Sequence, residues 1–238
     1  MKTEDLDYSG DGLTFRGYLA YDDTNSAPRP GVLILHEAWG LTRHVMERAR
    51  MLADLGYVAL AADLFGGRRQ ITDPAEARPL MAALRADPSA LRGRAQAGLA
   101  ALAAQPLVDP LRLAAIGFCF GGMTALELAR DGAALAGAVS FHGGLETSAP
   151  AAPGAVKAKI LVLTGADDPM IPPDQVVAFE EEMRQAGTDW QVVAYGGAVH
   201  GFMNRWAAVT LPGVRHDART EIRAWAAMNS FFGEIFGA

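Results

Sequence analysis

The 238-residue sequence has only one cysteine, Cys119. A single cysteine excludes a disulfide within the chain and any metal site built from several thiolates. If Cys119 has a chemical role, it acts as a free thiol. The alternative is that it is a small buried apolar residue, which is the commoner case for a lone cysteine.

Long apolar runs and an excess of positive charge are also missing. No apolar run approaches the roughly 18 residues that cross a bilayer, and the first residues lead into no signal-peptide core. The sequence therefore predicts a cytoplasmic protein without membrane contact. With 21 Lys and Arg against 27 Asp and Glu, the net charge of −6 argues against a nucleic-acid partner. We expect a small-molecule substrate instead, and the sequence indicates no particular oligomeric state.

What is present is a regular alternation of short apolar runs and helical patterns, without internal repeats, which we interpret as one domain over residues 1–238. The expected strands are Leu13–Tyr21, Gly31–Leu35, Tyr57–Ala62, Leu111–Ile116, Ala136–Phe141, Ile160–Thr164 and Gln191–Tyr195. The expected helices are Val45–Leu55, Pro74–Arg85, Ser89–Ala104, Met123–Arg130, Pro173–Ala186 and Asp217–Phe236. The first strand is expected to be exposed, whereas the continuous apolar runs after it suit a parallel sheet covered on both faces. An α/β fold follows, either an open doubly wound sheet with helices on both faces or a closed barrel.

The segment Gly117–Gly122 carries the strongest chemical signal. It follows an apolar strand and precedes a helix, which is the context of a nucleophile elbow with Cys119 at its centre. The positive end of the helix favours the thiolate, and the N–H of Phe120 points towards an oxyanion. Glycine-rich turns also occur in nucleotide-binding folds, but this glycine spacing is not a dinucleotide fingerprint and no Lys-Ser/Thr follows. The motif therefore favours the open sheet.

A base and an acid are available in the order that this fold requires, nucleophile then acid then histidine. Asp167 and Asp168 follow the strand Ile160–Thr164, and Pro169 biases Asp168 towards an extended conformation. Asp167 remains an alternative, with turn formation as its structural role. His200 lies in a glycine-rich loop after the next strand and is the expected base.

The other histidines are given structural roles or left open. His44 and His216 lie in predicted helical or polar surroundings, where a structural role is expected. His36 and His142 end predicted strands and, together with His200, would be the candidates for a metal cluster, but no ligand-spacing motif supports one. We expect neither a metal nor a cofactor.

Four motifs together resemble the dienelactone hydrolase family over nearly the whole chain, from about Gly10 to Phe236. The motifs are Leu35–Gly40, Gly117–Gly122, Gly165–Pro169 with Pro172, and Ala198–Phe202. The resemblance implies a triad of Cys119, Asp168 and His200, with Asp168 selected by its distance from Gly165. It also implies that Glu37 holds the resting thiol and that the N–H of Ala38 completes the oxyanion site with that of Phe120.

The resemblance is weaker in the substrate-binding residues. The family has a carboxylate-binding arginine four residues after the histidine, where this chain has Asn204; Arg205 comes next, and Arg78 or Arg85 would be a second arginine. This departure puts dienelactone itself in doubt as the substrate. The aromatic residues that flank the motifs would line an apolar pocket or pack the core; they are Trp39, Phe118, Phe120, Phe202 and Trp206.

The expected function is hydrolysis of carboxylic esters or lactones through a thioester acyl-enzyme. Two alternatives stay open at this point. One is an acyltransferase or thioesterase with the same triad, and the other is a non-catalytic binding protein on the same fold.

Overall fold

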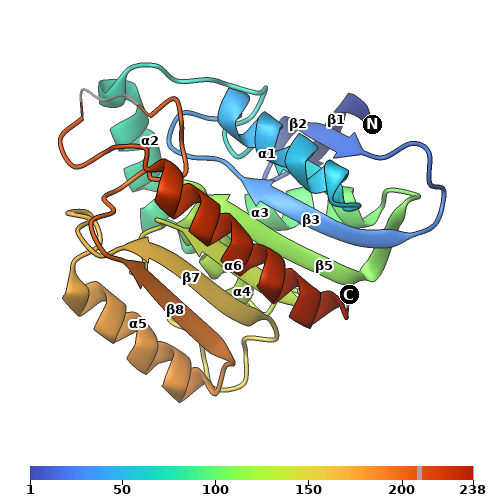
Figure 1. Cartoon of the computed structure of the whole chain (residues 1–238). Coiled ribbons are helices and arrows are strands. Elements are labelled where there is room, and N and C mark those ends of the chain that lie inside the picture. The colour runs from blue at the N-terminus through green and yellow to red at the C-terminus, as the bar shows by residue number, and fades with distance from the viewer. Residues whose placement is uncertain (208–210, 238) are drawn as a thin grey trace.

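A computed structural model describes residues 1–207 and 211–237 and contains one eight-stranded sheet, in the order β1-β2-β4-β3-β5-β6-β7-β8. The strands are β1 Lys2–Gly10, β2 Leu13–Tyr21, β3 Arg29–Leu35, β4 Val58–Ala62, β5 Val108–Phe118, β6 Gly137–Phe141, β7 Lys159–Gly165 and β8 Trp190–Tyr195. The pairs β1–β2 and β2–β4 are antiparallel, and the neighbours from β4 to β8 are parallel. The sheet is open and mostly parallel (Figure 1), which confirms the doubly wound alternative over the barrel.

Helices cover both faces of this sheet. They are α1 Arg43–Asp54, α2 Pro74–Ala86, α3 Pro88–Ala103, α4 Phe120–Arg130, α5 Pro173–Ala186 and α6 Ala218–Phe236. In Figure 1, α1 and α6 lie on the near side of the sheet, with α3 and α4 behind it. Two apolar clusters correspond to these two faces: Val45 and Phe232 belong to the cluster of α1 and α6, and Leu99 and Phe179 to that of α3, α4 and α5.

The central strand β3 explains why both faces are covered. All of its residues are buried, and alternate side chains enter opposite clusters: Val32 and Ile34 face α1 and α6, whereas Leu33 and Leu35 face the other layer. This is the pattern expected for a continuous apolar run in a parallel sheet. The loops after β3, β5, β7 and β8 leave the same carboxyl edge of the sheet, where ligand sites of open α/β sheets form.

The structure differs from the sequence-based expectation at the N-terminus. Strand β1 was not predicted, because most of its residues are polar and exposed, as on an edge strand. The prediction that Leu13–Tyr21 is exposed is wrong for much of the strand: Phe15, Leu19 and Ala20 are buried because β2 lies inside the sheet, between β1 and β4.

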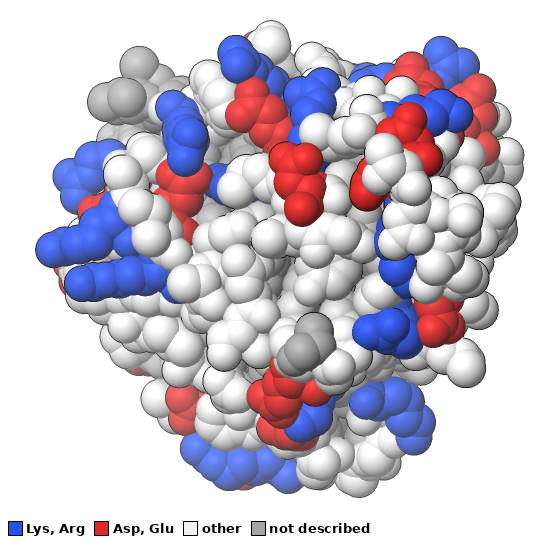
Figure 2. Space-filling model, turned by 45° about the vertical axis from the view of Figure 1, so that its right-hand side comes forward, with Lys and Arg blue, Asp and Glu red and all other residues white. Residues whose placement is uncertain are grey.

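The described residues contain no helix that is both long and apolar enough to cross a membrane. On the face shown in Figure 2, positive and negative side chains are interspersed around a largely uncharged centre.

Candidate active site

Cys119 occupies a strained turn between β5 and α4. Its backbone has φ 53° and ψ −115°, a conformation that costs free energy in a residue other than glycine. The flanking glycines are sterically required: a Cβ on Gly117 would lie 1.9 Å from the carbonyl oxygen of Gly121, and one on Gly121 would lie 2.1 Å from that of Leu35. The turn therefore places the half-buried Cys119 at the positive end of α4.

His200 and Asp168 meet at the same edge of the sheet. Nδ1 of His200 lies 2.8 Å from Oδ2 of Asp168, and both side chains are buried. The backbone N–H of Met170 donates to the other carboxylate oxygen at 2.8 Å, which fixes the direction of the aspartate. Asp167 is exposed, so the structure brings Asp168 rather than Asp167 to the histidine.

The remaining nitrogen of His200, Nε2, is buried and makes no hydrogen bond with the described residues. Burial is the largest influence on the pKa of His200 and lowers it. Cys119 and Asp168 both raise the pKa through their charges, and Asp168 also through its hydrogen bond with the ring. Their combined influence outweighs that of burial and raises the pKa of His200 to about 10. This arrangement favours the imidazolium form of His200.

Two backbone N–H groups are free to bind an oxyanion. Phe120 is the first residue of α4, where the N–H has no partner within the helix, and Ala38 follows β3 in the neighbouring loop. Within the described residues, neither N–H donates to a backbone carbonyl. Buried and unpaired N–H groups beside a thiol are suited to binding the oxyanion of a tetrahedral intermediate.

Glu37 is buried next to these residues but is bonded elsewhere. Its Oε2 accepts a hydrogen bond of 2.6 Å from Nδ2 of Asn204 and lies 3.5 Å from Nδ1 of His44. Burial would raise the pKa of Glu37, but the neighbouring His44, His200 and Asn204 lower it. Asn204, the residue at the position of the family arginine, thus contacts Glu37.

Cys119 and His200 line one cavity of about 170 Å³. Ala38, Trp39 and Arg78 also line it, and most of the other lining side chains are apolar. A neighbouring cavity shares Trp39 and Asn204 with it and extends the recess towards Trp206.

Three residues that were expected to bind substrate do not line this cavity. Phe202 is fully buried and packs edge-on against His142 and Tyr195 in the core. Arg205 is exposed and forms an ion pair with Glu221. Arg85 lines a separate and more polar cavity, which shares only Met170 with the first.

Two histidines that sequence reasoning did not assign to the site lie close to it. His44 was given a structural role, yet it lies beside Glu37. His142 was left open; its ring centroid lies 5.1 Å from that of His200, and neither of its nitrogens has a partner among the described residues. A histidine in a predicted helix gives no local signal of such a contact.

His36 has a structural explanation, because Nδ1 lies 2.6 Å from the carbonyl oxygen of Glu37 and Nε2 lies 3.1 Å from the N–H of Leu64. Across residues 1–207 and 211–237, no three His, Cys, Asp or Glu side chains gather as metal ligands would.

An elbow residue at the end of a parallel strand, a buried histidine–aspartate pair and an open doubly wound sheet define an α/β-hydrolase. The dienelactone hydrolase family model matches residues 15–236, and the chain belongs to that family.

The solved structure named m3DLH is 45% identical to this chain and has a TM-score of 0.94, with 99% of this chain and 98% of that one covered. A dienelactone hydrolase-like promiscuous phosphotriesterase, P91, from metagenomic libraries is 44% identical with the same TM-score and coverage. A Saccharolobus solfataricus relative, whose provisional name is carboxymethylenebutenolidase, is 26% identical over 98% of each chain.

Proposed function

We propose that this member of a hydrolase family cleaves carboxylic esters or lactones with Cys119 as the nucleophile, His200 as the base and Asp168 as the residue that orients the base. The observation that carries the proposal is the half-buried thiol on a strained turn, in one cavity with a histidine whose Nδ1 is held by a carboxylate at 2.8 Å. No group outside the chain is needed for this chemistry.

The proposed cycle begins when the sulfur of Cys119 attacks the carbonyl carbon. The oxyanion that forms accepts hydrogen bonds from the N–H groups of Ala38 and Phe120. Collapse breaks the carbon–oxygen bond of the ester, the Nε2 proton of His200 passes to the departing alkoxide, and a thioester remains. His200 then removes a proton from water, which attacks the thioester and releases the acid and the thiol.

The cavity supports a small and largely apolar acyl group. Arg78 is the arginine that lines it, so Arg78 would bind the carboxylate of a substrate that carries one. Asn204 contacts Glu37 and Arg205 does not line the cavity, so the loop after His200 contributes no arginine to it.

A panel of p-nitrophenyl esters and unsaturated lactones tests the proposal. Wild type is expected to show a burst of product, and mass spectrometry is expected to show one acyl adduct on Cys119. Cys119→Ala is expected to lower kcat/KM by about 10⁴-fold or more. Full activity of that variant would refute the nucleophile.

Two alternatives predict different outcomes in the same assays. An acyltransferase or thioesterase would pass the acyl group to an added thiol or alcohol faster than to water, or would prefer thioesters to oxygen esters. A binding protein would turn over no ester at all.

Phosphotriester hydrolysis is a second candidate function, favoured by the 44% identity to P91 over 99% of this chain. The same N–H pair would bind a phosphoryl oxygen. Wild type is then expected to release the aryl alcohol from an aryl dialkyl phosphate, and Cys119→Ala is expected to lose this activity.

A further inference from the structure

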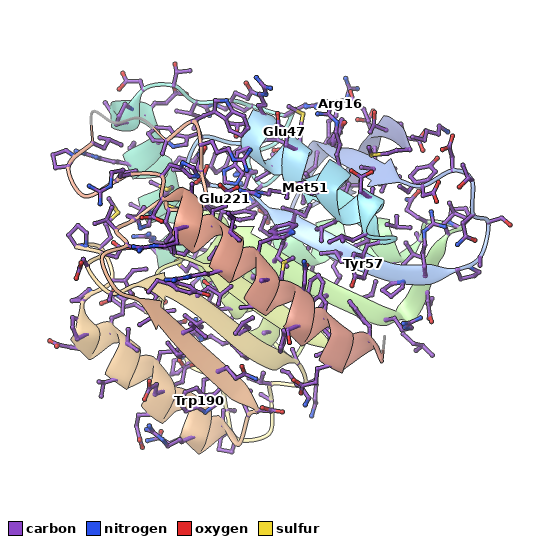
Figure 3. The ribbon with its side chains drawn as sticks, in the orientation of Figure 1. Arg16, Glu47, Met51, Tyr57, Trp190 and Glu221 are labelled. Atoms are coloured by element: carbon purple, nitrogen blue, oxygen red, sulfur yellow. The ribbon has the colours of Figure 1, made fainter. Side chains whose placement is uncertain are left out.

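A buried chain of polar side chains runs from the candidate active site to α1 and α6. Nε of Arg48 donates to Nε2 of His44 at 3.2 Å, and Nη2 of Arg48 lies 2.7 Å from Oε1 of Glu221. Arg48 also donates to the carbonyl oxygen of Met203 at 2.6 Å. Figure 3 shows Glu221 near the start of α6, on the side that faces α1. Arg48 is therefore held firmly from several sides.

These contacts fix the tautomer of His44. A guanidinium group can only donate, so Nε2 of His44 must accept and the ring proton must sit on Nδ1. Nδ1 faces Oε2 of Glu37 at 3.5 Å. The side chain of His44 is 1% exposed, so water does not compete for this contact. Burial strengthens the attraction between the N–H dipole and a carboxylate.

Oε2 of Glu37 thus accepts a hydrogen bond from Asn204 and faces the N–H of His44 at 3.5 Å, a nitrogen that has no hydrogen-bond partner among the described residues. Within the described residues, no hydrogen bond joins Glu37 to Cys119. The polar contacts of this carboxylate among the described residues therefore come from Asn204 and His44 and not from the sulfur.

We propose that His44 and Asn204 are positioning residues that hold Glu37 as a carboxylate away from the thiol, so that Cys119 is available to His200 before any substrate binds. The inference rests on the proposed role of Cys119. It differs from the resting state implied by the family resemblance, in which Glu37 holds the thiol.

Alkylation by iodoacetamide tests this directly, because Cys119 is the only cysteine and one mass increment reports its reactivity without any ester. At about pH 6.5, where an ordinary thiol is almost fully protonated, rapid labelling of the wild type is expected. In His44→Phe the released Glu37 takes up the thiol, and labelling is expected to slow by about tenfold. Adding Glu37→Gln to His44→Phe should restore most of the rate.

Two further variants separate positioning from mere packing. His44→Asn keeps an N–H donor near the place of Nδ1 and is expected to label faster than His44→Phe. Glu47→Gln changes a solvent-accessible ion pair on the same helix and should label like the wild type.

An unchanged labelling rate in His44→Phe, or a slow rate that Glu37→Gln does not restore, would overturn the inference. If His44→Phe does not fold, Asn204→Leu, with and without Glu37→Gln, gives the same comparison from the other donor.

Labelling as expected without turnover of any ester would refute the proposed function alone. Ester turnover by Cys119 together with slow labelling of the resting wild type would refute the inference alone.

Discussion

The two ends of α4 differ in whether the buried polar side chains beside them have hydrogen-bond partners. At the C-terminal end, Arg92, Glu127, Arg130 and Glu182 form a network in which Arg130 is 1% exposed and bonded to both glutamates, at 3.0 and 2.7 Å. None of these four side chains leaves a buried polar atom unpaired. At the N-terminal end, Nε2 of His200 and both nitrogens of His142 have no partner among the described residues.

This difference indicates which residues stabilise the fold and which are available to a substrate. A paired network resists unfolding and offers nothing to a ligand, whereas buried groups without partners cost free energy unless a substrate uses them. We therefore expect substitutions in the first region to change stability and substitutions in the second to change turnover.

Asp168→Asn is expected to have the largest effect. The amide can donate to Nδ1 and so favours the tautomer with the proton on Nε2, which cannot accept a proton from the thiol; kcat/KM should fall by about 10³-fold or more. Asp167→Asn, on the exposed neighbour, is the control and should stay within about twofold of the wild type. Equal losses in the two variants would contradict the assignment of Asp168.

Arg130→Met is expected to lower the free energy of unfolding by about 3–5 kcal/mol, because it leaves buried carboxylates without their partner. The kcat of the folded fraction should be unchanged. Arg184→Met removes exposed ion pairs with Glu180 and Glu181 and should cost less than about 1 kcal/mol. Denaturant titration and ester turnover are measured on the same samples. A loss of kcat in Arg130→Met would contradict the expectation that this region affects stability alone.

The pH dependence of stability tests the surroundings of His200. The pKa of His200 is raised from 6.5 to about 10 in the folded protein, so its contribution to stability is full below pH 6.5 and is lost as the pH rises through about 10. The free energy of unfolding should fall across this range, and Cys119→Ser should make the fall smaller because Cys119 is one of the two residues that raise the pKa of His200. A steeper fall in Cys119→Ser would reverse the expected sign.

Arg78→Gln is expected to have the smallest effect. For an ester that carries a free carboxylate, KM should rise by about fivefold, which corresponds to the free energy of one solvent-accessible ion pair. A neutral ester of the same size should be affected by less than about twofold. Arg85→Gln, in the separate cavity, is the matched control. A larger effect of Arg85→Gln would indicate that the substrate carboxylate binds in that cavity and not beside Cys119.

Much of the fold follows from local patterns. The helix Pro173–Ala186 has the predicted bounds, and β3 to β8 appear within a few residues of the apolar runs that predicted them. Helix α4 begins three residues earlier than expected, directly after Cys119. The role of the triad stays a prediction, although the chain order that selected Cys119, Asp168 and His200 also brings Asp168 to His200 in space.

The sequence by itself determined the alternation of strands and helices, the strained turn at Cys119 and the order of the three expected catalytic residues, because each depends on neighbours along the chain. Only the tertiary structure decided that Arg78 lines the cavity while Arg85 and Arg205 do not, and that Asn204 contacts Glu37 across 167 positions of sequence. Side-chain contacts of that kind depend on how separate loops meet at the sheet edge, and no local periodicity encodes that meeting.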